Sequence, residues 1–368
     1  MRIAFYAPLK PPDHPVPSGD RQVAQLFLKA LRLAGHEPVL ASRFRSFEGR
    51  GDGQRQARLA VLGRRLADRS LRRYRETPMA APELWFTYHL YHKAPDWLGP
   101  RISTALEIPY VVAEASFAPK QAGGPWTIGH RAAEQAIRHA DAVIGLNPAD
   151  HACVLPLLAD PSRWVAVRPF VDADCFRPRA VADGQAPRLI AAAMMRHGDK
   201  LASYRILGEA LAGLLDLDWS LEVVGDGIAR AQIATALAPL GSRVIWCGAL
   251  SPEATARRLS EADLYVWPAI NEAFGMALLE AQASELPVVA GDSGGVAGIV
   301  AHEITGLLVP PGDAAGFAAA VRRLLIDCGL RRHYGAAARR RVLAEHDLSV
   351  AAARIEAIIR RLGRARAA

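Results

Sequence analysis

Residues 269–295 read AINEAFGMALLEAQASELPVVAGDSGG and carry two glutamates, Glu272 and Glu280, eight positions apart. The apolar run after the first glutamate predicts a helix over 276–283, with Glu280 on the helix and Glu272 in the loop before it. An ionised carboxylate accepts hydrogen bonds from the paired hydroxyls of a sugar, and free N–H groups at a helix start face anions. The stretch therefore predicts a site for a ligand with sugar hydroxyls and an anionic group.

A short strand and a glycine loop complete this stretch. Residues 286–290, LPVVA, have the composition of a buried strand. The strand leads into Ser293, Gly294 and Gly295, where the missing side chains let backbone approach a ligand closely. Without the strand and the glycine loop, the alternative interpretation of the stretch with Glu272 and Glu280 is a helix with two surface glutamates.

The pattern resembles the donor-site signature of the retaining glycosyltransferases of family four, which have the GT-B fold. Their usual pattern is Glu-Gly-Phe-Gly, a short apolar helix with a second glutamate, Leu-Pro-Val-Val-Ala and a Gly-Gly loop, and it continues here as TGLLVPPGD over 305–313. Two residues depart from it: Ala273 stands where glycine is usual, and Gly298 stands where a Pro-Glu pair normally ends. The resemblance covers nearly all of the chain and is strongest over 189–313.

This resemblance implies an α/β architecture of the GT-B type, with two facing Rossmann-like domains, parallel sheets and an interdomain cleft. It places an acceptor-side domain at 1–175, a nucleotide-sugar donor domain at 176–345 and, at 346–368, a helix that crosses back to the first domain. The polar, proline-rich stretch that ends at Pro187 is the predicted linker. The length of 368 residues independently favours two domains, because single cores rarely exceed ~250–300 residues.

Composition indicates a soluble globular protein, with 51% apolar and 22% charged residues. The four cysteines are scattered without metal-ligand spacing, which favours a reducing cytoplasm. The start, MRIAFYAPLKPPD, is a short apolar run cut by prolines and not a signal peptide. No apolar stretch reaches the ~18–20 residues that span a bilayer. We therefore expect a cytoplasmic protein.

Residues 43–75 hold eleven arginines against three carboxylates, and this difference of +8 equals the net charge of the whole chain. On a helical wheel of 55–75, the apolar residues gather in one arc, and all eight arginines of the span lie outside it. The arc consists of Leu59, Leu66, Ala67, Leu71 and Tyr74. Such a helix can lie on an anionic membrane surface; the alternative is a helix packed on the N-terminal sheet with a solvated arginine face. Nucleic acid is disfavoured, because no aromatic residues interleave with the arginines.

The N-terminal segment predicts a nucleotide-type α/β opening, with a strand over 2–7, a helix over 22–33 and a strand over 37–41. Ser18-Gly19-Asp20 precedes the helix. The resemblance implies that Gly19 approaches the donor diphosphate and the acceptor. An N-capped helix start is the alternative for Ser18 and Asp20.

Two further predicted strands, over 84–87 and 109–113, end in polar residues. Ligands of open α/β sheets bind beyond the carboxyl ends of the strands, so these residues are candidates for contact with an acceptor or a phosphate. The candidates are His89, His92 and Lys93 after the first strand and Glu114 and Ser116 after the second. Many family members have a histidine at the second strand end, and this chain has none there. A structural role is the alternative for each candidate.

The resemblance assigns the donor side to loops of the second domain. Arg196 and Lys200 would clasp the donor pyrophosphate, since a guanidinium fork and an ammonium both stabilise a departing diphosphate. Their spacing is one shorter than usual, and Arg205 is a further cation nearby. Glu272, with the backbone of Phe274-Gly275, would hold the sugar, and Glu280 would hold the ribose. The other predicted donor-binding residues are Gly225, Leu250 in the loop that resembles the nucleobase loop, Gly294 and Gly295.

The function implied by the resemblance is retaining transfer of a hexosyl unit from a nucleotide diphosphate sugar, UDP- or GDP-linked, to an acceptor hydroxyl. Neither a metal nor another cofactor is expected. A glycan or lipid-linked acceptor, a role in cell-surface glycan or glycolipid assembly, and peripheral contact of 55–75 with an anionic membrane are the corresponding expectations. Two alternatives stay open: a binding or scaffold protein with the same architecture and no turnover, and a GT-B phosphorylase or epimerase.

Overall fold

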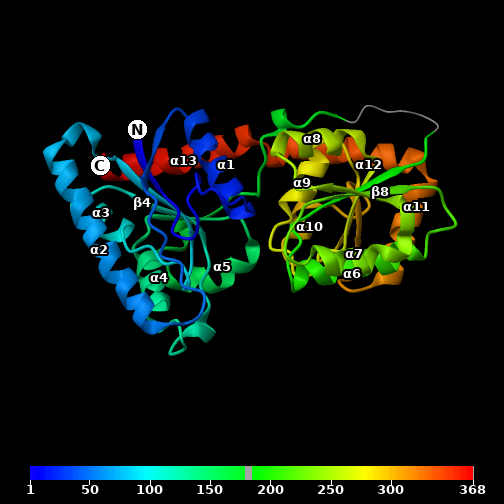
Figure 1. The fold of residues 1–368 in the computed structure, drawn as a ribbon. Coiled ribbons are helices and arrows are strands. Elements are labelled where there is room, and N and C mark those ends of the chain that lie inside the picture. The colour runs from blue at the N-terminus through cyan, green and yellow to red at the C-terminus, as the bar shows by residue number, and fades with distance from the viewer. Residues whose placement is uncertain (179–184, 368) are drawn as a thin grey trace. The chain divides into compact units, whose positions relative to one another are not determined.

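The computed structural model describes residues 1–178 and 185–367, so the predicted linker lies partly outside the described residues. The chain divides into two compact units (Figure 1). The N-terminal unit comprises Met1–Arg168 together with Leu348–Ala368, and the C-terminal unit comprises Pro169–Asp347. The division thus falls after residues 168 and 347, compared with the expected boundaries after 175 and 345.

The N-terminal unit contains a six-stranded, entirely parallel sheet with the order β2-β1-β3-β4-β5-β6. The strands are β1 (Arg2–Tyr6), β2 (Glu37–Ser42), β3 (Leu84–Leu90), β4 (Tyr110–Ala115), β5 (Ala142–Gly145) and β6 (Trp164–Ala166). The helices are α1 (Gly19–Leu33), α2 (Gly53–Glu76), α3 (Gly99–Leu106), α4 (Thr127–His139), α5 (Pro148–Val154) and α13 (Leu348–Ala367). Short 3-10 turns lie at η1 (Pro78–Ala80), η2 (Pro119–Gln121), η3 (Leu155–Leu157) and η4 (Pro161–Arg163).

The C-terminal unit contains a second six-stranded parallel sheet, with the order β12-β11-β10-β7-β8-β9. The strands are β7 (Arg188–Ala192), β8 (Ser220–Val224), β9 (Val244–Gly248), β10 (Leu264–Trp267), β11 (Val288–Gly291) and β12 (Gly306–Val309). The helices are α6 (Asp199–Ala212), α7 (Arg230–Leu237), α8 (Pro252–Glu261), α9 (Met276–Ala283), α10 (Val296–Ile299), α11 (Ala314–Ile326) and α12 (Cys328–Arg341). Turns of 3-10 type lie at η5 (Ala173–Cys175) and η6 (Ala238–Arg243), and a π-helical turn lies at η7 (Val342–His346).

The strand order locates the switch point of each sheet, which is where open parallel sheets bind ligands. In the N-terminal unit the chain winds from β1 to β2 on one side and from β3 towards β6 on the other, so the switch lies between β1 and β3. In the C-terminal unit it winds from β7 to β9 on one side and from β10 to β12 on the other, so the switch lies between β7 and β10. The predicted α/β architecture is confirmed in both units.

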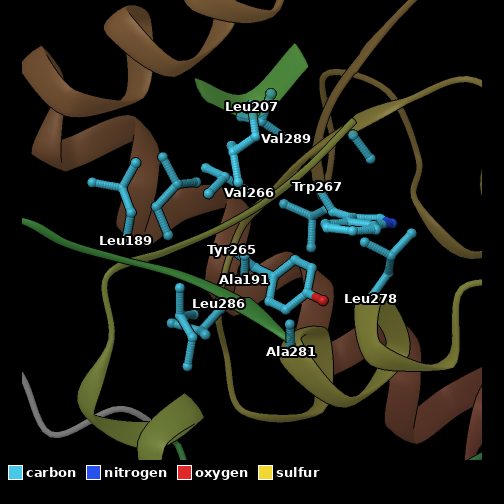
Figure 2. Packing of buried hydrophobic residues seen from close by; sticks show 14 of the residues in the cluster. Leu189, Ala191, Leu207, Tyr265, Val266, Trp267, Leu278, Ala281, Leu286 and Val289 are labelled. Atoms are coloured by element: carbon cyan, nitrogen blue, oxygen red, sulfur yellow. The ribbon is translucent and has the colours of Figure 1, made fainter. Parts of the chain in front are cut away.

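The core of the C-terminal unit fixes the strands at its switch point. Leu189 on β7, Tyr265 and Val266 on β10 and Val289 on β11 are fully buried, and Figure 2 shows them with Leu278 of α9 among the members of one hydrophobic cluster. Helices lie on both sides of the sheet, with α6 and α7 below it and α8 and α9 above it in Figure 1. Strands covered on both faces have to be apolar along their length, which explains runs such as LPVVA.

Helix α2 turns the predicted apolar arc towards its own unit. Ala67, Leu71 and Tyr74 are buried in the N-terminal core, while Leu59 and Leu66 are half-buried. The arc is therefore used for packing, which was the alternative interpretation, and the arginines form the exposed side. Searching the described residues finds no helix with the length and apolar content needed to cross a bilayer.

Candidate functional site

The C-terminal switch point brings together a lysine, a glutamate and a tryptophan. Lys200 is the second residue of α6, in the connection that follows β7, and Glu272 lies in the loop that follows β10. Lys200 Nζ donates to Glu272 Oε2 over 2.5 Å. Trp267 Nε1 donates to the same oxygen over 3.2 Å, and the lysine ammonium lies 5.2 Å from the centre of the Trp267 ring. Two residues predicted for separate tasks, the diphosphate and the sugar, are thus direct partners.

Two further hydrogen bonds fasten the start of α6 to the loop after β10. Asn271 Nδ2 donates to Asp199 over 2.9 Å, and the N–H of Ile270 donates to Ser203 Oγ over 3.1 Å. The loop needs this support, because Ala269 and Asn271 both adopt φ of +52°. Side-chain-bearing residues at positive φ cost free energy and persist where the surroundings hold them. Such strain concentrates at functional sites, so this loop is a candidate for one.

The glycine loop predicted to approach a ligand packs against the backbone of the Glu272 loop. A Cβ on Gly294 would lie 2.0 Å from the carbonyl oxygen of Glu272, and one on Gly295 would lie 2.3 Å from that of Ala273. Gly294 also has φ of +58°. The glycines are therefore required for loop-on-loop packing, and contact with a ligand at this point stays a prediction.

Helix α9 begins where expected, and its residues occupy different depths. Gly275 is the N-cap with φ of +76°, Phe274 beside it is half-buried, and Glu280 is buried on the helix. Burial raises the pKa of Tyr265 most, and the negative charges of Glu280 and Glu272 raise it further. Both glutamates therefore act electrostatically on the same tyrosine. The helix start and the second glutamate thus belong to the same electrostatic environment as the Lys200–Glu272 pair.

Other predicted donor-side residues lie outside this contact network. The Arg196 side chain is exposed, and its guanidinium has no hydrogen bond or ion pair with another residue of the described ranges. Gly225 has φ of +133°, and a Cβ on it would lie 2.0 Å from the Ala193 carbonyl oxygen, so it too is needed for backbone packing. Leu250 is half-buried just before Ser251, the N-cap of α8. Gly19 opens α1 behind the N-cap Ser18, and the space at its Cβ position is open.

The N-terminal switch point holds a histidine–carboxylate pair. His89 near the end of β3 has φ of +60°, and its Nδ1 lies 2.8 Å from Asp20 Oδ1 in the first turn of α1. Burial lowers the pKa of His89, but the hydrogen bond and charge of Asp20, together with the charges of Glu114 and Asp150, raise it, and the net pKa is raised. Burial likewise raises the pKa of Asp20, and His89 lowers it by more. Each partner therefore favours the charged form of the other.

Two more carboxylates lie close enough to His89 to influence its charge. Glu114 near the end of β4 has φ of +59°, is buried, and accepts from the N–H of Leu146 over 2.7 Å. Burial raises the pKa of Glu114 to about 7, against the opposing effects of this hydrogen bond and of His89. Ser116 Oγ donates to Asp150, whose pKa is raised mainly by burial. We call Asp20, His89, Glu114, Ser116 and Asp150 the strand-end cluster.

The remaining acceptor-side candidates form a separate group. Lys93 Nζ lies 4.6 Å from the centre of the Trp126 ring, and the His92 ring lies 5.6 Å from it, edge to face. Burial, followed by the positive charge of Lys93, lowers the pKa of His92. The structure thus joins His89, Glu114 and Ser116 in one cluster and places His92 and Lys93 on a tryptophan instead.

Sequence reasoning missed three kinds of participant. Trp267 ends an apolar strand and looks like core, Asn271 gives no signal for positive φ, and Asp150 is one of many surface-type acids. The ligand rule for strand ends could have flagged Trp267, because it directly precedes the loop that holds Glu272. Nothing in the sequence connects Asp150 with His89, since their proximity depends on the order of strands in the sheet.

Two parallel-sheet units with these topologies define the class of the protein, the GT-B fold of glycosyltransferases. Sucrose-phosphate synthase from Thermosynechococcus elongatus matches the structure with a TM-score of 0.74 and 22% identity, covering 99% of this chain and 100% of that chain. HepE of Anabaena in complex with UDP-glucose matches with a TM-score of 0.70 and 16% identity, covering 99% of both chains. At these identities the likeness establishes the fold alone.

Sequence comparison finds similar proteins for part of the chain. Residues 186–327 match the family model described as Glycosyl transferases group 1, so this segment of the chain is similar to the group 1 glycosyltransferases. D-inositol 3-phosphate glycosyltransferase of Geodermatophilus obscurus is 32% identical over 238 residues, 55% of this chain and 50% of that protein. A GDP-mannose-dependent alpha-mannosyltransferase of Mycolicibacterium smegmatis is 40% identical over 131 residues, 34% of this chain and 32% of that protein. The aligned part of the chain thus spans half or less of the length of these relatives.

Proposed function

We propose that the protein is a retaining glycosyltransferase that transfers a hexosyl unit from a nucleoside diphosphate sugar to an acceptor hydroxyl. The observation that carries the proposal is the Lys200–Glu272 pair at the C-terminal switch point, where a cation and a hydroxyl acceptor stand side by side. A nucleoside diphosphate sugar needs both, a cation for the diphosphate and a carboxylate for the sugar hydroxyls. The family of residues 186–327 supports the same reaction class.

The roles of the donor-side residues follow from their chemistry. In the reaction, the bond from the sugar C1 to the phosphate oxygen breaks, and its electron pair stays on the diphosphate. Lys200 and Arg196 stabilise that growing negative charge. Glu272 and the N–H groups at the start of α9 hold the sugar, and Glu280 accepts from the ribose hydroxyls. UDP and GDP are the leading donor nucleotides, because HepE is described with UDP-glucose and the mannosyltransferase relative as GDP-mannose-dependent.

The strand-end cluster receives the acceptor hydroxyl in this proposal. His89 is held at Nδ1 by Asp20, and within the described chain its Nε2 has no hydrogen-bonding partner, so this nitrogen is free to meet a hydroxyl. The acceptor oxygen bonds to C1, and its proton passes to the departing diphosphate oxygen. His89 and the two residues that contact Trp126, His92 and Lys93, are the acceptor-side binding residues of the proposal.

A donor panel tests the reaction. UDP-, GDP- and ADP-sugars are added singly, and thermal stability and nucleotide release are measured with a panel of polyol, glycoside and lipid-linked acceptors. Saturating donor at ~100 times its dissociation constant should add about 2.7 kcal/mol of stability. Transfer with retained anomeric configuration supports the proposal. Binding without turnover would favour a scaffold, phosphate-dependent release a phosphorylase, and isomerised sugar nucleotide an epimerase.

The proposal also predicts that transfer survives treatment with EDTA. The charge of the diphosphate is met here by Lys200 and Arg196, so an added divalent ion is not required. The rate is measured before and after chelation, with magnesium or manganese added back. Complete loss that either ion restores would contradict the metal-free assignment.

We further propose peripheral contact with an anionic membrane, because the arginines of α2 are exposed while its apolar arc faces its own unit. Contact through arginines predicts binding that depends on anionic lipid and fades as salt rises. Such contact would place the enzyme beside a lipid-linked acceptor and suit a role in glycolipid or cell-surface glycan assembly.

A further inference from the structure

A groove lies between the second half of α2 and the carboxyl end of the edge strand β2. It has a volume of about 570 Å³. Its polar lining consists of Ser42 from β2 and of Arg69, Ser70, Arg72, Arg73 and Glu76 from α2. Arg69, Arg72 and Arg73 are spaced i, i+3 and i+4, so they project from one face of the helix towards the groove.

The three guanidiniums of the groove are not neutralised within the protein. None of them makes an ion pair or a hydrogen bond with a residue in the described part of the chain. The acid nearest in sequence, Asp68, pairs with Arg101 of α3 over 2.6 Å instead. Glu76 is the single carboxylate of the lining. Three unpaired forks of N–H donors beside two serine hydroxyls match the oxygens of a phosphate group.

The same exposed side of α2 carries an apolar hollow towards the N-terminus of the helix. Ala57, Val61 and Leu62 line it between Arg58 and Arg65, and its volume is about 400 Å³. Val61 and Leu62 are 41% and 45% exposed, whereas the opposite side of α2 is buried in the core. A helix side with exposed apolar residues next to a cationic groove suits a ligand that is apolar at one end and anionic at the other.

We propose that this groove binds the phosphate of an anionic phospholipid headgroup, with Val61 and Leu62 in contact with the apolar boundary of the bilayer. The apolar hollow favours a lipid over a free phosphate, because a soluble anion gains nothing from it. The inference rests on the membrane contact proposed above and not on the transfer reaction. The proposal is more specific than an electrostatic attraction between arginines and a charged surface, because it assigns the headgroup a defined binding site.

Two matched triple variants of α2 distinguish a defined headgroup-binding site from non-specific attraction to a charged surface. R69Q/R72Q/R73Q removes the groove cations, and R55Q/R64Q/R75Q removes three exposed arginines that line neither the groove nor the hollow. Binding to vesicles of phosphatidylcholine with phosphatidylglycerol is measured by co-sedimentation, with circular dichroism as a check on helix content. Both variants lose the same charge, so a difference between them reports on the groove. We expect the groove variant to bind at least about tenfold more weakly than the control variant, because only it loses the guanidiniums that would bind the phosphate. Equal losses of vesicle binding in the two variants would contradict a specific headgroup site and leave only attraction to the charged surface. An absence of vesicle binding by the wild-type protein would contradict membrane contact itself.

A second pair of measurements distinguishes a lipid from a soluble phosphate. V61S/L62S should weaken vesicle binding severalfold, and inorganic phosphate at matched ionic strength should compete poorly. Full competition by millimolar phosphate together with unchanged binding of V61S/L62S would show a site for a free anion and overturn the lipid assignment.

Discussion

At the scale of single residues, Lys200 is a cation that two neighbours in the C-terminal unit hold in place. Its ammonium is bonded to Glu272 and lies over the ring of Trp267, so under the proposed function it is already positioned for a diphosphate. Preorganised charges of this kind contribute most to rate, because they stabilise charge as it develops. Arg196 is exposed and lacks such support, so its contribution depends on the ligand itself.

Replacing either cation should therefore slow transfer. Lys200→Ala and Arg196→Ala should each lower turnover at saturating donor by about 10²–10³, or roughly 2.7–4 kcal/mol of transition-state stabilisation. Arg257→Ala is the matched control, because Arg257 is an exposed arginine of α8 with no role in the proposed site. Turnover and donor affinity are measured separately for the three variants. Normal turnover in Lys200→Ala would remove the lysine from the diphosphate site.

Glu114 makes the stability of the N-terminal unit depend on pH. Its pKa is about 7 in the folded chain and 4.5 in its ordinary state, so the folded chain binds the extra proton between these values. The unfolding free energy should thus fall as pH rises from 4.5 to 7, by up to about 3 kcal/mol from this group. Glu114→Gln keeps an oxygen for the Leu146 N–H and removes the charge. Melting at pH 5 and pH 8 should show the variant stabilised at pH 8 and nearly unchanged at pH 5; equal effects at both values would refute the assignment.

At the scale of elements, loops at the ends of parallel strands determine the site, and they were the hardest part to foresee. The sequence pattern predicted α9 and the strands β1, β2 and β11 closely, because covered strands and helices leave clear apolar runs. It placed His89 and Glu114 beyond their strands, whereas both lie inside longer strands with positive φ. Backbone strain depends on tertiary contacts, so no local pattern encodes it. The buried arc of α2 shows the same limit, since a helical wheel cannot say what covers an apolar side.

The loop pair formed by the glycine turn and the Glu272 loop offers a test at this scale. Gly294→Ala places a methyl group against the Glu272 carbonyl at φ of +58°, so the loops have to separate. We expect a loss of about 1–3 kcal/mol in unfolding free energy and weaker donor binding. Gly298→Ala is the control, because its Cβ position is open and alanine favours the helix. Equal donor affinity in the two variants would show that this packing does not shape the site.

At the scale of the whole molecule, the two units differ in how the chain completes them. The C-terminal unit is continuous and closes on itself, because Val171 N–H donates to His346 over 2.9 Å and Ala173 N–H donates to Asp347 over 3.2 Å. The N-terminal unit is completed only by α13, which returns from the far end of the chain to pack on α1. A helix over 346–368 that crosses back to the first domain is what the family resemblance implies, whereas the apolar pattern of 348–367 alone indicates a helix and not its partner.

Removal of α13 should therefore weaken one unit and spare the other. Ile355, Ile358 and Ile359 are buried, and His36 Nε2 lies 2.6 Å from Glu356 Oε2. Exposing three isoleucines costs roughly 1.5–3 kcal/mol each, a sum comparable with the total stability of a domain at about 5–15 kcal/mol. In a chain cut after residue 347, hydrogen exchange should accelerate throughout β1 and β3 and stay slow in β7 and β10.

A single substitution makes the same test without shortening the chain. Ile355→Ala should cost about 2–5 kcal/mol and lower the protection of the N-terminal sheet, because it leaves a cavity against α1. Arg354→Ala, one position earlier and exposed, should leave both sheets unchanged. Hydrogen exchange read by mass spectrometry resolves the two sheets peptide by peptide. Uniform loss of protection in both sheets would mean that the units unfold as one and that α13 stabilises the whole chain.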